Sequence, residues 1–185
     1  MKIVHKLDKG NYVYSHYNDF YIDCINEYFK DRSISMIEVG VFKASVLKSF
    51  MAKNFSFEKY IGVDPYIGDK TDYYHNAYWA NSSEANKVYW ESKKIYDSCK
   101  NAELIKTTSF DFFMNYAKNH DTKFDVVLID GDHRREPTLL DIFLGFQYLK
   151  EDGIMFIDDY ANSDTPEVTS AINGFISAYE EFIDE

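Results

Sequence analysis

The chain of 185 residues has little that marks a membrane, secreted or fibrous protein. It contains only 2 Cys, 3 Pro and 8 Gly. Two cysteines, Cys24 and Cys99, are too few for a disulfide framework, so we expect a reduced, cytoplasmic setting. No apolar run approaches the roughly 18 residues that span a bilayer, and no cationic segment leads into an apolar one at the N-terminus. A collagen-like chain, a membrane protein and a disulfide-stapled scaffold are therefore excluded.

Basic residues are also scarce relative to acidic ones. Lys and Arg number 20 against 31 Asp and Glu, which gives a formal net charge of −11. Because a nucleic-acid binder usually presents a basic face, this balance argues against a DNA or RNA partner. It leaves cationic ligands and divalent metals open.

Apolar and aromatic residues, in contrast, are plentiful. They make up 45% and 18% of the chain, enough for a large core. The length and the lack of a linker or repeat predict one domain over residues 1–185. Within it we expect an N-terminal helical arm over residues 1–32. Residues 66–81, which are aromatic and polar without clear periodicity, are interpreted as a lid.

Short apolar segments alternate with amphipathic ones along the chain. The apolar segments predict strands over 36–40, 60–64, 102–107, 124–130 and 153–158. The amphipathic segments predict helices over 17–30, 45–54, 83–100, 110–118, 137–149 and 166–182. This alternation is typical of an α/β protein with an open, doubly wound parallel sheet covered by helices on both faces. Ligands of such sheets lie beyond the carboxyl ends of the strands.

Polar residues stand at the ends of four of the five predicted strands. They are Glu38 and Gly40, then Asp64, then Asp130 and Asp132, and finally Asp158 and Asp159. Because the carboxyl ends of parallel strands share one edge, we expect these residues to converge on one crevice. The alternative, that each Asp begins a turn or caps a helix, stays open.

Two parts of this crevice suit an anionic or hydroxylated ligand. The turn from Glu38 to Ser45 enters a helix, so its backbone N–H groups can receive a polar ligand group. Asp64 ends the next strand, where a carboxylate can accept hydrogen bonds from both hydroxyls of a ribose. An ordinary turn residue before Pro65 is the alternative for Asp64.

The acids that follow the last two strands indicate a metal. Asp130, Asp158 and Asp159 in one small space repel one another unless a cation neutralises them. Carboxylate oxygens favour Mg²⁺, Mn²⁺ or Ca²⁺ over zinc. A solvated acidic rim is the alternative. The neighbouring His133, Arg134 and Arg135 either bind an anionic part of a substrate or balance the acids.

These segments together resemble a known family. IEVGVFKAS, YIGVD, VVLIDGDH and GIMFIDDY, spread over Met36 to Tyr160, resemble class I S-adenosylmethionine-dependent methyltransferases. More narrowly, they resemble the metal-dependent, macrocin-type sugar O-methyltransferases, whose chemistry is similar to that of catechol O-methyltransferase. The resemblance implies a Rossmann-like sheet of order 3-2-1-4-5. The C-terminal edge hairpin of the family is missing before Glu185, which implies a minimal or truncated version with an open or covered sheet edge.

The resemblance also implies roles for single residues. Glu38 and Gly40 would lie under the methionine part of the cofactor, Asp64 would hold the ribose, and Ser109 and Asp130 would line the same site. Asp130, Asp158 and Asp159 would bind Mg²⁺, with Mn²⁺ or Ca²⁺ as alternatives, and Asp132 would be the general base. Two residues depart from the family: Ala44 replaces a usual Gly, and Thr108 replaces an Asp that often faces the adenine.

Three functions are consistent with these observations. The first is metal-assisted methyl transfer from S-adenosylmethionine to a hydroxyl of a sugar or another vicinal diol. The second is a non-catalytic, cofactor-binding partner domain. The third is another metal-dependent enzyme on the same scaffold. The acceptor would be a small molecule, with neither nucleic acid nor membrane as partner, and a homo-oligomer stays among the options.

Overall fold

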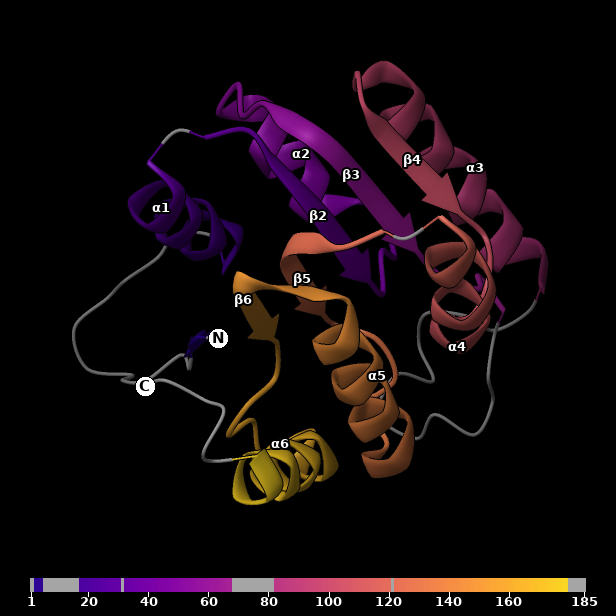
Figure 1. Cartoon of the computed structure of the whole chain (residues 1–185). Coiled ribbons are helices and arrows are strands. Elements are labelled where there is room, and N and C mark those ends of the chain that lie inside the picture. The colour runs from indigo at the N-terminus through magenta and orange to yellow at the C-terminus, as the bar shows by residue number, and fades with distance from the viewer. Residues whose placement is uncertain (1, 5–16, 31, 68–81, 121, 180–185) are drawn as a thin grey trace.

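The computed structural model describes residues 2–4, 17–30, 32–67, 82–120 and 122–179 (Figure 1). The strands are β1 (Lys2–Val4), β2 (Ile34–Val39), β3 (Phe57–Val63), β4 (Ala102–Ile105), β5 (Phe124–Ile129) and β6 (Leu149–Ile157). The helices are α1 (Tyr17–Phe29), α2 (Ser45–Ala52), α3 (Ser82–Ser98), α4 (Ser109–Asp111), the π-helical turn η1 (Phe112–Ala117), α5 (Arg135–Tyr148) and α6 (Pro166–Tyr179). Most of the predicted lid, 68–81, lies outside the described residues.

The six strands form one sheet in the order β1-β6-β5-β2-β3-β4, and every pair is parallel. The predicted order of the five central strands is thus confirmed. The sequence analysis missed β1, which lies in the arm that was predicted to be helical. It pairs with β6 from Lys2 opposite Ile154 to Val4 opposite Phe156. The edge beyond β6, expected to be open or covered, therefore carries a strand of the same chain.

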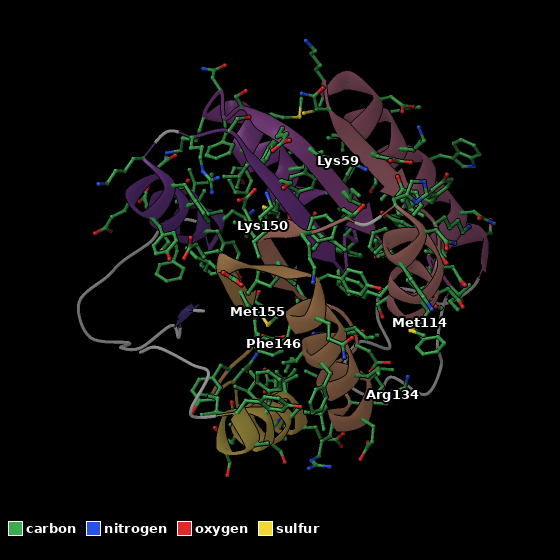
Figure 2. All side chains as sticks on the ribbon, viewed as in Figure 1. Lys59, Met114, Arg134, Phe146, Lys150 and Met155 are labelled. Carbon is green, nitrogen blue, oxygen red and sulfur yellow. The ribbon has the colours of Figure 1, made fainter. Side chains whose placement is uncertain are left out.

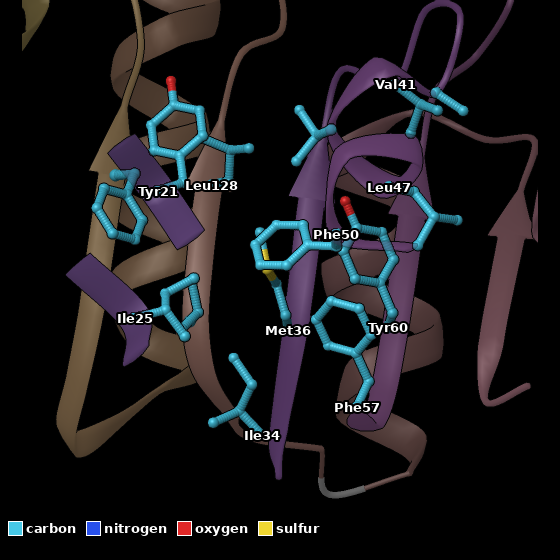
Figure 3. Close-up of a cluster of buried hydrophobic side chains, with 14 of the residues drawn as sticks. Tyr21, Ile25, Ile34, Met36, Val41, Leu47, Phe50, Phe57, Tyr60 and Leu128 are labelled. Carbon is cyan, nitrogen blue, oxygen red and sulfur yellow. The ribbon is translucent and has the colours of Figure 1, made fainter. Parts of the chain in front are cut away.

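Helices cover both faces of the sheet, as the apolar periodicity predicted. Side chains of α1, α2 and α3 form one core with alternate residues of the strands. Figure 3 shows Tyr21 and Ile25 of α1 beside Leu128 of β5 in this core, and Phe50 of α2 beside Met36. Side chains of η1, α5 and α6 form the second core with the remaining strand residues. The central strands β2 and β5 are buried along their whole length, which explains their continuous apolar runs.

The amino edge of the sheet holds a neutralised acid. Asp125 of β5 is 2% exposed. Its carboxylate accepts hydrogen bonds from the Ser35 backbone N–H and from Nζ of Lys150, at 2.8 and 2.9 Å, and Arg32 forms an ion pair with it at 2.8 Å. Burial alone would raise the pKa of Asp125, but these partners hold it below the usual value. Arg134 lies just before α5 and Lys150 just after it, in β6, so the two residues mark opposite ends of this helix (Figure 2).

In the part of the chain that the structure describes, none of the helices combines the length and apolar character that crossing a membrane requires.

Candidate active site

The residues after four central strands lie side by side at the carboxyl edge of the sheet. Strand hydrogen bonding continues one residue past the strands: the N–H of Gly40 donates to Val63, that of Asp130 to Val39, and that of Asp158 to Ile129, at 2.8 to 2.9 Å. The backbone N–H of Asp64 donates to the carbonyl oxygen of Ile105 at 3.3 Å. Gly40, Asp64, Asp130 and Asp158 therefore converge, as predicted from their positions at the strand ends.

The turn between β2 and α2 needs its glycine. Gly40 has φ of +88°, and a Cβ there would lie 1.8 Å from the carbonyl oxygen of Asp130, so no side chain fits. The same turn holds Phe42 and Ala44 at φ of 49° and 55°, in the left-handed region. A residue with a Cβ adopts that region at a cost of about 1 kcal/mol relative to Gly. Ala44 thus takes up the conformation that the usual family Gly would adopt more easily.

Asp64 clamps this turn from the neighbouring strand. Its Oδ2 accepts hydrogen bonds from the N–H groups of Val41 and Phe42, at 3.0 and 2.9 Å, and its Oδ1 accepts one from Tyr66 at 2.7 Å. Burial raises the pKa of Asp64, and the three amides oppose that rise. The Phe42 carbonyl is held as well, by the hydroxyls of Tyr66 and Ser92 at 3.1 and 2.8 Å. The ribose role of Asp64 stays a prediction, and its carboxylate already accepts three amides.

Glu38 lies below the turn in a polar network of its own. It is 1% exposed, and its Oε2 accepts hydrogen bonds from the hydroxyls of Tyr60 and Tyr96 at 2.6 and 3.0 Å. Burial raises the pKa of Glu38 to about 8, although the two hydroxyls oppose the rise. The network joins β2, β3 and α3 directly behind the predicted cofactor turn. Contact with the methionine part of a cofactor stays a prediction for Glu38.

The acids after β5 and β6 gather with a histidine. One potential ligand atom from each of Asp130, His133 and Asp159 lies within 4.8 Å of the other two. The Nε2 atom of His133 is 3.0 Å from Oδ2 of Asp159. Burial, and then the charges of Asp158 and Asp159, raise the pKa of Asp130 well above its usual value. Asp159 adopts φ of 59°, a strained conformation of the kind that clusters at functional sites.

Two of the three predicted metal ligands, Asp130 and Asp159, belong to this group. The third, Asp158, directly precedes Asp159 and is outside the group; its Oδ1 accepts a hydrogen bond from the backbone N–H of Asp159 at 2.9 Å. Tyr21 of α1 lies close to these acids: burial, and then the charges of Asp158 and Asp130, raise its pKa. Two carboxylates and an imidazole suit a divalent cation. Such an ion would also relieve the repulsion among the acids, so the donor set fits a metal.

Asp132, the predicted general base, is paired with a cation. Nε of Arg134 donates to both of its carboxylate oxygens, at 2.9 and 3.0 Å, and Nη2 of Arg134 donates to Oδ2. The backbone N–H of Arg134 also donates to Oδ1, at 2.9 Å, where the chain enters α5. Because Arg134 contacts both carboxylate oxygens, Asp132 must separate from Arg134 before it can reach a substrate hydroxyl. The base role stays a prediction.

The loop after β4 carries Ser109, a predicted cofactor residue. Its Oγ donates to Oδ1 of Asp141 on α5, at 2.5 Å. The side chain of Thr108 is used locally: it accepts the N–H of Asp111 at 3.1 Å and donates to Oδ2 of Asp111 at 2.8 Å. Thr108 is thus the N-cap of α4.

Sequence reasoning missed two residues at this edge, Tyr21 and Asp141. Tyr21 fits the apolar face of α1 and gave no separate signal. Asp141 did give one, because an acid between Leu140 and Ile142 on a core-facing helix is unusual. His133 was noticed only for its charge, without a place in the predicted metal site.

Comparison with known proteins places the chain in a family. Residues 37–160 match the model of a family described as a methyltransferase domain. The chain belongs to this methyltransferase family. A relative, the uncharacterized protein R132 of Acanthamoeba polyphaga mimivirus, is 26% identical over 151 residues, 80% of this chain and 62% of the viral protein. The chain therefore spans less than two thirds of that relative.

Solved structures of other methyltransferases share the fold. The calicheamicin methyltransferase CalS11 superposes with a TM-score of 0.62 at 17% identity, over 85% of this chain and 69% of CalS11. MycE of the mycinamycin pathway, solved in complex with Mg and S-adenosylhomocysteine (SAH), has a TM-score of 0.54 at 15% identity, over 92% of this chain and 44% of MycE. At these identities the likeness shows the Rossmann-like methyltransferase fold.

Proposed function

We propose that this chain transfers the methyl group of S-adenosylmethionine to a hydroxyl of a sugar or another small vicinal diol, assisted by a divalent cation. The observation that carries the proposal is the contact between the turn at Gly40 and the acids after β5. A Cβ on Gly40 would collide with the backbone of Asp130. A cofactor on that turn would therefore place its methyl group beside the acids.

The turn, Asp64 and the acids suit three parts of the cofactor: its methionine carboxylate, its ribose and its sulfonium. The backbone N–H groups at the start of α2 can receive the carboxylate of its methionine part. Asp64 supports that turn and lies where a ribose would bind. Asp130, Asp158 and Asp159 together with a bound divalent ion would leave a net charge near −1, which suits the positively charged sulfonium. All of these groups are held in place before a ligand arrives, which favours an in-line displacement.

Asp130 and Asp159, with His133 beside them, are the residues that would hold the cation. When bound, a divalent ion supplies positive charge that lowers the pKa of an acceptor hydroxyl. The hydroxyl oxygen then bonds to the methyl carbon, the carbon–sulfur bond breaks, and its electron pair stays on sulfur, which yields SAH. Asp132, once released from Arg134, takes the hydroxyl proton.

The choice of acceptor rests on the acid cluster and on the related enzymes. A vicinal diol can approach a cation through both oxygens, so it matches a site that leaves coordination positions open. CalS11 is described as a TDP-rhamnose 3′-O-methyltransferase, and NovP, another structure with this fold, as an O-methyltransferase. Both descriptions support an oxygen acceptor, and the first supports a sugar.

Binding and turnover test the proposal separately. Calorimetry should detect SAH binding to the wild-type protein. Labelled S-adenosylmethionine, offered with sugar nucleotides, glycosides and catechols, should label at least one acceptor, and the label should disappear with chelator and return with Mg²⁺ or Mn²⁺. Asp159→Asn should weaken Mn²⁺ binding measured by electron paramagnetic resonance (EPR). Asp152→Asn, an exposed acid at the other end of β6, is the matched control and should leave binding unchanged.

Three other results would contradict parts of the proposed function. Absence of SAH binding at millimolar concentration would refute the methyltransferase proposal. Full turnover after exhaustive chelation would refute the metal but keep methyl transfer. Binding of SAH without transfer to any acceptor would favour a cofactor-binding partner domain.

A further inference from the structure

A buried acid on α5, Asp141, has no role in the function proposed above. Asp141 is 5% exposed and shares the core-facing side of α5 with Thr138, Ile142 and Gly145. Burial raises the pKa of Asp141 to about 7, the bond from Ser109 opposes this rise, and the charge of Asp132 adds to it. A carboxyl group in such a position is costly to bury. Apolar residues on the same helix face would pack there without that cost.

The two carboxyl oxygens of Asp141 meet two different loops. Oδ1 accepts the Ser109 hydroxyl at 2.5 Å, which fixes the start of α4 after β4. Oδ2 lies 3.2 Å from the position that a Cβ on Gly131 would take, so this oxygen lies next to the turn between Asp130 and Asp132. Asp141 therefore sets the spacing between the loops after β4 and β5, across the ends of β2 and β3.

The strand order indicates which part of the cofactor would lie between the loops after β4 and β5. The acids after β5 and β6 mark the side where methyl transfer would occur, and Asp64 after β3 marks the ribose. The ribose lies between the sulfur and the adenine in the cofactor. The adenine must therefore continue past Asp64, away from the acids, toward the end of β4. Ser109 begins the helix that follows there, and the Thr108 side chain is already used as a cap.

We propose that Asp141 is a positioning residue for the adenosine half of the cofactor, because it holds Ser109 and the Gly131 turn at a fixed spacing. This inference rests on the proposed cofactor. It assigns a role to a residue that touches neither the reacting atoms nor the cation.

Binding of two ligands by matched variants tests the proposal. SAH contains both halves of the cofactor, whereas 5′-methylthioadenosine contains the adenosine half without the amino-acid part. Asp141→Leu, which removes the acceptor, should weaken both ligands by the same factor, about tenfold, the usual effect of losing one buried hydrogen bond. Asp141→Asn keeps an acceptor oxygen for Ser109 and should recover most of the affinity. Glu136→Gln, exposed on the same helix, should bind like wild type.

A double-mutant cycle keeps the test valid if Asp141→Leu does not fold. Asp141→Ala and Ser109→Ala should be non-additive in ligand affinity, because each of them removes the same hydrogen bond. Additive effects, or a loss for SAH without a loss for 5′-methylthioadenosine, would overturn the inference. So would variants that unfold at lower temperature but bind both ligands like wild type, since their role would be purely structural. Wild-type protein that binds neither ligand would overturn the proposed function and this inference with it.

Discussion

Replacement of Glu38 by Gln should remove a large part of the pH dependence of stability. The Gln carbonyl can stand where Oε2 now accepts the hydroxyls of Tyr60 and Tyr96. Burial raises the pKa of Glu38 from 4.5 to about 8 in the folded protein. One unit of pKa difference corresponds to about 1.4 kcal/mol. The full difference is therefore worth roughly 5 kcal/mol on the free energy of unfolding.

The sign follows from which state binds the proton. Between pH 4.5 and 8 the folded protein keeps the Glu38 proton while the unfolded chain loses it. Rising pH therefore favours the unfolded state, and wild type loses the stability that Glu38 contributes at low pH. Glu38→Gln cannot ionise. Its free energy of unfolding relative to wild type should grow by about 3 kcal/mol from pH 5 to pH 8.

Urea unfolding followed by circular dichroism at pH 5, 6, 7 and 8 measures this difference. Glu58→Gln, the same change at an exposed position of β3, is the control and should track wild type across the series. If the difference between Glu38→Gln and wild type did not change with pH, Glu38 would be ionised in the folded protein throughout. The argument from burial would then be wrong.

Two further changes separate binding from chemistry. Asp64→Ala removes the acceptor of three amides, so SAH affinity should fall by about 1–3 kcal/mol in calorimetry; unchanged affinity would contradict both the clamp and the ribose role. Asp132→Asn should lower kcat by roughly 10²–10⁴ while SAH still binds. Arg134→Gln, which releases Asp132 from its ion pair, should lower kcat far less, and equal losses in the two variants would assign the effect to the ion pair rather than to a base.

The central sheet could be predicted because each of its strands has a strong signal. β2 and β5 are buried on both faces, so they appear in the sequence as continuous apolar runs between polar residues. Parallel pairing brings the carboxyl ends of the strands to one edge, so the sequence alone predicts that Gly40, Asp64 and Asp130 lie together there. β1 has three residues, too few for periodicity to show, and its pairing with β6 is non-local.

The side-chain partners at that edge could not be predicted in the same way. Spacing tells where the backbone of Asp132 lies, but its ion pair with Arg134 depends on the rotamers of both residues. The group of Asp130, His133 and Asp159 shows the same limit, because the spacing in the sequence does not tell that His133 lies beside the two acids. The partners of Asp141 depend on how α5 packs against the sheet, which the sequence pattern does not give.

Asp125 in β5 and Asp130 just after it differ in their surroundings, and the difference supports the proposed cation at the carboxyl edge. Asp125, at the start of the strand, is surrounded by Arg32 and Lys150, and its pKa is lowered despite burial. For Asp130, just past the other end, burial and the charges of neighbouring acids, Asp158 first, raise the pKa. The chain thus places Arg and Lys beside the acid at the amino edge, whereas other acids surround Asp130 at the carboxyl edge. Since like charges repel, a divalent ion there would lower the pKa of Asp130 and gain binding energy from the same repulsion.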